Sequence, residues 1–269
     1  MLNADPTQRF TRHAHDYARS RPGYPEALLG VLARECGLRR EHVIADLGAG
    51  TGLLTMVFAR AGHRVFAVEP NAAMRAEAAA RLRLWSGCSL LDTRAEATGL
   101  AAGSVDCAVA GAAFHWFDPE PTRAELRRIL APDGWFVVVA NRRRTEAGGA
   151  TQALDELLTR FNRHPAAARR RLRDEALTAF FGTDGCRRVS LPHGQRLDAP
   201  GWRGLLGSFS SLPAAGQPGH GALLAAADEA FAAHQHHGRV TLAYTTVLTF
   251  GRVGADLGLD CTEFPAGGA

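Results

Sequence analysis

Short apolar runs alternate along the first half of the chain with segments whose apolar residues recur at helical spacing. Continuous apolar runs indicate strands buried on both faces. Strands that alternate with helices are typical of crossover units and predict a parallel sheet. A helix over 26–36, preceded by Pro25 and followed by Gly37, comes before this pattern. The expected strands are 42–47, 64–69, 88–92, 104–111 and 134–141, and the expected helices between them are 52–61, 71–85 and 119–130.

The pattern changes after residue 141, where helical periodicity dominates before a long β-rich run. No internal repeat and no linker divides the chain, so a single domain is expected. The segments expected here are helices over 151–161 and 166–181, a weak strand near 187–191, a helix over 221–236 and a β-rich run over 239–253.

The composition is that of a soluble globular protein. Of 269 residues, 46% are apolar and 22% are charged. No apolar run approaches the roughly 20 residues that span a bilayer. The N-terminal stretch has no apolar core of a secretory signal, which predicts a cytoplasmic protein without a membrane partner. The five cysteines form no C-x-x-C pair, so we expect reduced thiols and no metal site.

All the basic side chains other than histidine are arginines, because the chain contains no lysine. This usage, with abundant alanine and glycine, indicates a GC-rich genome. The net charge of +4 is modest. The arginine runs 142–144 and 169–173 could contact phosphates, but solvated helix faces are the favoured interpretation. We therefore expect no nucleic-acid partner.

A glycine-rich loop follows the first expected strand of the sheet. Asp46 and three glycines form the pattern D-x-G-x-G-x-G between a strand and a helix. Glycine permits positive φ and lets a ligand approach the backbone without a Cβ in the way. A dinucleotide fingerprint requires glycine at the sixth position, where this chain has Leu53. A Walker loop requires lysine, so phosphate binding is disfavoured. The three glycines are Gly48, Gly50 and Gly52.

Two acids indicate the ligand of this loop. Glu69 ends the next strand, where a carboxylate can accept hydrogen bonds from both hydroxyls of a ribose. Asp46 would repel a pyrophosphate but suits a ligand with a cationic tail. S-adenosylmethionine carries both an ammonium group and a sulfonium charge. The loop therefore predicts an adenosine-type ligand, with S-adenosylmethionine as the cofactor.

The order of these motifs resembles the class I S-adenosylmethionine-dependent methyltransferases, and among them the bacterial small-molecule group of trans-aconitate methyltransferase-like proteins. The resemblance rests on "YARSRPGYP", "VIADLGAGTGLL", "VFAVEPNAAM", "SVDCAVAGAAFHWFD" and "AELRRILAPDGWFVVVANRR", and extends to "RGLLGSFSSLP" and "GRVTLAYTTVLTFGR". It implies a Rossmann-like α/β fold, with a mainly parallel seven-stranded sheet, helices on both faces and an inserted helical lid. The implied parts are cofactor-covering helices (1–40), a cofactor-binding core (41–141), a lid and acceptor-binding insertion (142–236), a strand region (237–253) and a tail (254–269).

The resemblance also implies which residues bind the cofactor. The glycine loop would hold the methionine moiety, and Glu69 the ribose. Arg21 would bind the methionine carboxylate, while Arg94 departs from the small or acidic residue usual at its position. Ala112 stands where this group often has glutamine. The full expected set is Tyr17, Arg21, Asp46, Gly48, Gly50, Gly52, Glu69, Pro70, Met74, Arg94, Ala95, Glu96 and Ala112.

His115 follows the fourth expected strand of the sheet, at the carboxyl edge where open α/β folds bind ligands. Imidazole titrates near neutral pH, so His115 can accept a proton from an acceptor. The alternative is that His115 and Trp116 wedge this loop against the next helix. The expected acceptor-binding residues are His115, Trp116, Trp202, Ser208, Phe209 and Ser210, with Tyr244 as a weaker candidate.

The function implied is methyl transfer from S-adenosylmethionine to a small-molecule acceptor, in specialised natural-product metabolism. One alternative is a nucleic-acid methyltransferase, although the arginine runs lack interleaved aromatic residues for base stacking. The other is a protein that retains S-adenosylmethionine without transferring its methyl group. The acceptor, the atom methylated and the oligomeric state stay open.

Overall fold

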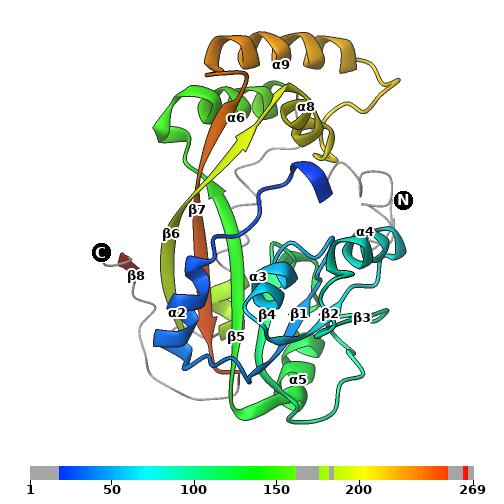
Figure 1. The fold of residues 1–269 in the computed structure, drawn as a ribbon, viewed down its shortest axis with the longest axis vertical. Coiled ribbons are helices and arrows are strands. Elements are labelled where there is room, and N and C mark those ends of the chain that lie inside the picture. Colours follow the sequence, from blue (N-terminus) through cyan, green and yellow to red (C-terminus); the bar gives the residue numbers. More distant parts are fainter. Residues whose placement is uncertain (1–17, 162–175, 182–184, 254–262, 266–269) are drawn as a thin grey trace.

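A single sheet organises the molecule (Figure 1). The computed structural model describes residues 18–161, 176–181, 185–253 and 263–265. Within these residues the strand order is β3-β2-β1-β4-β5-β7-β6-β8. The first five of these pair in parallel, whereas β7 runs antiparallel to both β5 and β6. The strands are β1 (Val43–Leu47), β2 (Arg64–Val68), β3 (Cys88–Leu91), β4 (Val105–Gly111), β5 (Leu130–Arg143), β6 (Cys186–Leu197), β7 (Val240–Gly251) and β8 (Glu263–Pro265).

Helices cover both faces of this sheet because the central strands bury apolar side chains on both sides. One face packs against α2 and α3, and the other against α5. The helix α4 packs beside α3, against the β3 end of the sheet. The helices are α2 (Ala27–Cys36), α3 (Thr55–Arg60), α4 (Ala72–Leu82), α5 (Pro119–Ile129), α6 (Gly149–Phe161), α8 (Ala199–Gly207) and α9 (His220–His234), with 3₁₀ turns η3 (Phe114–Trp116) and η4 (Thr145–Ala147).

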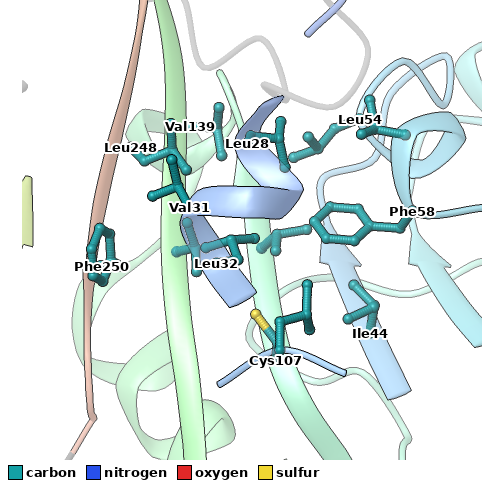
Figure 2. Packing of buried hydrophobic residues seen from close by; sticks show 14 of the residues in the cluster. Leu28, Val31, Leu32, Ile44, Leu54, Phe58, Cys107, Val139, Leu248 and Phe250 are labelled. Atoms are coloured by element: carbon teal, nitrogen blue, oxygen red, sulfur yellow. The ribbon is translucent and has the colours of Figure 1, made fainter. Parts of the chain in front are cut away.

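The helix α2 forms the centre of the first core (Figure 2). Its Leu28, Val31 and Leu32 are at most 1% exposed. They lie between strand residues such as Leu248 on one side and Phe58 of α3 on the other. Full burial of each leucine contributes about 1.5–3 kcal/mol. This packing fixes the point from which residues 18–24 run toward the carboxyl edge of the sheet (Figure 1).

A second hydrophobic core lies beyond the main sheet. The strands β5, β6 and β7 are long enough to extend past the helices on the sheet faces, and α6, α8 and α9 pack around their far ends (Figure 1). Trp202 of α8 is 1% exposed, and its Nε1–H donates to the carbonyl of Ala227 in α9 at 2.8 Å. We call the three helices α6, α8 and α9 the cap.

The fold class expected from the sequence is confirmed: seven strands form a mainly parallel sheet with helices on both faces, and a three-residue strand, β8, joins its edge. The weak strand expected near 187–191 is in fact the twelve-residue β6, which belongs to the main sheet. The expected helix over 52–61 begins only at Thr55, since Gly52 has φ +78° and cannot continue a right-handed helix.

Other expectations fall partly on residues that the structure does not describe. Of the helix expected over 166–181, only residues 176–181 are described, and they are helical. The expected tail contains β8, which pairs in parallel with β6, and its remaining residues lie outside the described part. Cys36, Cys88 and Cys107 are free, but Cys186 is disulfide-bonded, so the expectation of reduced thiols is wrong at Cys186. In the described part, no helix is both long and apolar enough to cross a membrane.

Candidate functional site

The candidate site lies where the order of the sheet reverses. The strand β1 is flanked by β2 on one side and by β4 on the other, and the chain returns to β1's far side only after completing β2 and β3. Open parallel sheets bind ligands at the carboxyl ends of strands at such a switch point. The carboxyl ends of β1, β2 and β4 bring together the glycine loop, Glu69 and the segment that contains His115.

The three glycines of the loop serve different purposes. All have positive φ, at +66°, +58° and +78° for Gly48, Gly50 and Gly52. A Cβ on Gly48 would lie 2.6 Å from Cβ of Ala113, so glycine permits close approach of the segment after β4. A Cβ on Gly52 would only touch α4. Above Gly50, no atom of the described residues lies within 4 Å of such a Cβ. Gly50 therefore leaves open the space that a ligand needs.

The carboxylate of Glu69 joins the loop to the end of β2. Its Oε2 accepts from the N–H of Gly50 at 2.9 Å, and its Oε1 accepts from the N–H of Asn71 at 2.8 Å. Glu69 is 8% exposed, and burial raises its pKa against the opposing effect of these two N–H donors and of Arg75. A carboxylate has about four acceptor positions, so each oxygen retains one for a ribose hydroxyl.

Asp46 is fully buried at the end of β1. Its Oδ2 accepts from Oγ1 of Thr55 at 2.6 Å. Its Oδ1 has no hydrogen-bond partner among the described residues, and the same holds for Oγ1 of Thr51 in the loop. Burial raises the pKa of Asp46 to about 7. A nearby cation would favour its ionised form, which is the charge preference expected of a site for a sulfonium nucleoside.

The residues after Glu69 begin α4. The side chain of Asn71 caps this helix by accepting from the N–H of Met74 at 3.0 Å. Met74 is buried, at 4% exposure, and Pro70 is half-buried. Arg75 donates to the carbonyl of Glu69 at 2.8 Å. The residues expected beside the adenosine therefore form the capped N-terminus of α4, and the side chain of Met74 packs in the protein interior.

The expected adenine-contacting segment forms a tight turn. Arg94 pairs with Ala97 across an isolated β-bridge, and Ala95 is buried in the core against α5. The side chain of Arg94 is exposed, whereas Oε1 of Glu96 accepts from the N–H of Asp118 at 2.9 Å. Glu96 therefore ties this turn to the segment that follows β4.

The segment after β4 starts with a strained residue. Ala112 has φ +54°, a left-handed conformation that costs an alanine about 1–2 kcal/mol, and its N–H is held by the carbonyl of Val139 at 2.9 Å. Such strain is often found at functional sites. His115 and Trp116 follow in η3, are both exposed, and their ring centroids are 4.8 Å apart. His115 is therefore on the surface of the carboxyl edge.

The structure places Arg21 and the remaining expected acceptor residues, Trp202, Ser208, Phe209 and Ser210, on the cap side. Nε of Arg21 donates to Oγ of Ser208 at 2.9 Å, and its guanidinium lies 4.0 Å from the centroid of the Phe209 ring. Ser210 is exposed, while Trp202 is enclosed in the cap core. Arg21 thus contacts the cap in this structure, and its role toward the methionine carboxylate stays a prediction. Tyr17 lies outside the described residues.

Several residues of the site were not expected from the sequence. Thr55 binds Asp46 from one turn beyond the glycines, and a hydroxyl in that helical turn was a signal that could have been used. Asn141 ends the expected strand, and its Nδ2 donates to the carbonyl of Gly23 at 2.8 Å. Arg81 donates to the carbonyl of Thr51 at 2.8 Å from the end of α4. Nothing in the sequence around Arg81 distinguishes it from the other arginines.

The chain is similar to known methyltransferases in sequence and in fold. Residues 45–138 match the family described as methyltransferase domain. The chain is 36% identical over 144 residues to uncharacterized methyltransferases of Mycobacterium bovis and Mycobacterium tuberculosis, which covers 54% of this chain and 56% of theirs. It thus spans little more than half the length of these curated relatives. A solved structure from Anaeromyxobacter dehalogenans, provisionally named a type II methyltransferase, is 28% identical with a TM-score of 0.66, covering 87% of this chain and 98% of that one.

The fold is Rossmann-like and α/β, and the geometry of the glycine loop fits an adenosine-containing ligand. Residues 45–138 resemble a methyltransferase domain, and S-adenosylmethionine is the cofactor that this match supports. The residues present fit this cofactor: Gly50 leaves open space, Glu69 retains acceptor positions, and the orphaned Oδ1 of Asp46 supplies negative charge. In the described part, no group of three His, Cys, Asp or Glu side chains could hold a metal ion.

Replacing Glu69 tests its expected role toward the ribose. Glu69→Ala removes a carboxylate that organises the loop, and we expect affinity for S-adenosylhomocysteine to fall about 10–100-fold, the loss of roughly 1.5–3 kcal/mol of charged hydrogen bonding. Titration calorimetry measures this change. Glu120→Ala, on the exposed side of α5, is the matched control and should keep the wild-type affinity. An unchanged dissociation constant for Glu69→Ala would refute the assignment.

The buried carboxyl of Asp46 should make the free energy of unfolding of the ligand-free protein depend on pH. Because burial raises its pKa from 3.8 to about 7, the folded state resists ionisation more than the unfolded state. The neutral carboxyl contributes its full share to the free energy of unfolding below pH 3.8, the pKa in the unfolded chain. That contribution is lost as the pH rises through about 7, the pKa in the folded protein. Asp46→Asn does not titrate, so its unfolding midpoint relative to wild type should rise by a few degrees between pH 5 and pH 8.

The comparison of Asp46→Asn with wild type uses thermal unfolding across that pH range. Asp133→Asn removes an exposed carboxylate and should give a difference that does not change with pH. If the Asp46→Asn difference is equally flat, the buried carboxyl does not titrate in this window.

Proposed function

We propose that the whole protein transfers a methyl group from S-adenosylmethionine to a small-molecule acceptor held between the glycine loop and the cap. The observation that carries this proposal is the Glu69 carboxylate bound to the N–H of Gly50 beside open space at the switch point. The cap supports a small acceptor, because α8 and its neighbours stand over the carboxyl end of β5 (Figure 1). A cap over the cofactor edge restricts entry to compact molecules.

The chain's main contribution to this reaction is positioning. When bound, the cofactor supplies an activated methyl group, and alignment of the two reactants can account for about 7–11 kcal/mol of the barrier. Glu69 would orient the ribose, and the negative charge of Asp46 would favour the cationic ligand. The cap and the segment over 18–24 would exclude water from the reacting atoms.

We expect the methyl acceptor to bind against the polar part of one sheet face, formed by residues of β5 and β7. Asn141 and Arg143 of β5 stand opposite Thr246 and Tyr244 of β7 in register. Side chains two residues apart on a strand share a face, so these four continue the face that buries Val139 in the first core. Oγ1 of Thr246 donates to Oδ1 of Asn141 at 2.6 Å. A polar zone between two apolar cores suits the recognition of a polar acceptor.

His115 is proposed to accept a proton from the acceptor where the acceptor must lose one. Its exposed position at the carboxyl edge of the sheet supports this role. The contact with Trp116, at 4.8 Å between ring centroids, equally supports the alternative of a wedge in the loop. Ser208 and Phe209, just after the end of α8, are proposed to line the acceptor-binding site. Trp202, in the interior of the cap, would hold them in place.

Two finer assignments stay predictions. One is membership of the trans-aconitate methyltransferase-like group, with a role in specialised metabolism. The other is the division into a cofactor core (41–141) and an acceptor-binding insertion (142–236). A protein that retains the cofactor without methyl transfer is the alternative function. Product analysis with isotope-labelled S-adenosylmethionine separates the two functions.

Thermal unfolding with single ligands tests the proposed function first. S-adenosylmethionine and S-adenosylhomocysteine, each at 100 times its dissociation constant, should add about 2.7 kcal/mol to the free energy of unfolding and raise the midpoint by several degrees. NAD at the same concentration serves as the control and should give no shift, because Leu53 replaces the third glycine of its fingerprint. A shift with NAD alone would overturn the proposal.

His115→Ala distinguishes a base from a wedge. Loss of a general base lowers kcat about 10²–10⁴-fold, and we expect this loss while affinity for S-adenosylhomocysteine is retained. The assay uses an acceptor found by screening the wild-type protein. His236→Ala removes an exposed histidine outside the proposed site and is the matched control. Wild-type turnover by His115→Ala would leave the wedge as the role of this side chain.

A further inference from the structure

Residues 18–24 connect the glycine loop with the cap, and we call this segment the strap. At one end of the strap, Arg81 of α4 makes two bonds with one guanidinium. Its Nε donates to the carbonyl of Thr51 at 2.8 Å, and its Nη2 donates to the carbonyl of Ala18 at 2.6 Å. The same half-buried side chain therefore holds both the cofactor loop and the strap.

The middle of the strap is bound to the cap side. Nε of Arg21 donates to Oγ of Ser208 at 2.9 Å, and Nη2 of Arg21 donates to the backbone carbonyl of Ser208 at 3.0 Å. The guanidinium also lies over the ring of Phe209. Ser20 packs so closely on α8 that a Cβ on Gly204 would collide with its Oγ. The strap and α8 therefore form one packed unit.

Side chains of the sheet hold the strap at two further points. Nε2 of Gln195 donates to the carbonyl of Ser20 at 2.7 Å, and Nδ2 of Asn141 donates to the carbonyl of Gly23 at 2.8 Å. Together with Arg81, these groups bind three backbone carbonyls of the strap, those of Ala18, Ser20 and Gly23. A strap held in this way can transmit a change in order from one end to the other.

We infer that the strap couples cofactor binding to the order of the cap, with Arg81 as the positioning residue at the cofactor end. This inference rests on the proposed function, since it requires a ligand at the glycine loop. A ligand that fixes the loop also fixes the carbonyl of Thr51, and through Arg81 it fixes the strap and α8. Coupling between two sites is reciprocal, so an acceptor that orders the cap must also tighten cofactor binding.

Hydrogen exchange with S-adenosylhomocysteine as the probe tests the coupling in the full chain. In the wild type, the probe should slow exchange of amides in the strap and in α8 (Ala199–Gly207). In Arg81→Ala, affinity for the probe should fall roughly tenfold, the loss of about one charge-assisted hydrogen bond. At saturating probe, protection of the loop should persist in this variant while protection of α8 is lost.

Three further variants keep the test decisive. Arg83→Ala removes an exposed arginine at the same end of α4 and should behave as the wild type. Arg81→Lys keeps the positive charge, but a lysine ammonium cannot bind the carbonyls of Thr51 and Ala18 together as the guanidinium does. Its affinity for the probe should therefore lie between those of Arg81→Ala and the wild type. Arg21→Ala cuts the strap from Ser208 and should abolish protection of α8, even if Arg81→Ala fails to fold.

The outcomes separate the two proposals. If the probe does not bind the wild type, the proposed function fails. If it binds and protects the loop but leaves exchange in α8 unchanged, the proposed function stands and the coupling is overturned. Equal protection of α8 in wild type, Arg81→Ala and Arg21→Ala would also overturn it, because a merely structural arginine would not carry the effect of the ligand.

Discussion

The two hydrogen bonds that the Glu69 carboxylate accepts hold the candidate cofactor site together. They join the N–H of Gly50, after β1, to the N–H of Asn71, at the start of α4. Each donor belongs to backbone that would otherwise be unsatisfied at a loop or helix terminus. One buried side chain therefore sets the distance between the ends of two neighbouring strands. The open space over Gly50 exists because this distance is fixed.

The central sheet and the glycine loop could be predicted because their signals are local. The motif from Asp46 to Gly52 lies within one strand, one loop and one helical turn, so its spacing fixes its geometry. Glu69 lies directly after the neighbouring strand, and parallel pairing then brings it to the same edge of the sheet. These residues needed no knowledge of how distant parts of the chain pack.

The contacts between distant segments could not be predicted in this way. Arg81 reaches Ala18 across 63 positions of sequence, and Arg21 reaches Ser208 across 187, so no periodicity records either pair. The length of β6 was missed for a different reason. Pro192 lies within it, and proline is depleted in strands. Within the described residues, β8 pairs with Arg188–Ser190 and not with Pro192, so no strand of the described part requires an N–H from Pro192 on that side.

The separate core of the cap has a consequence for how such a protein can diversify. Trp202 packs against α9 in a cluster distinct from those that bury the faces of the main sheet. Substitutions that reshape the cap therefore leave the packing beneath the glycine loop unchanged, since distant sites contribute to stability almost additively. Under the proposed function, a lineage can change the acceptor that the cap binds while inheriting the candidate cofactor site intact, provided that the strap still reaches both.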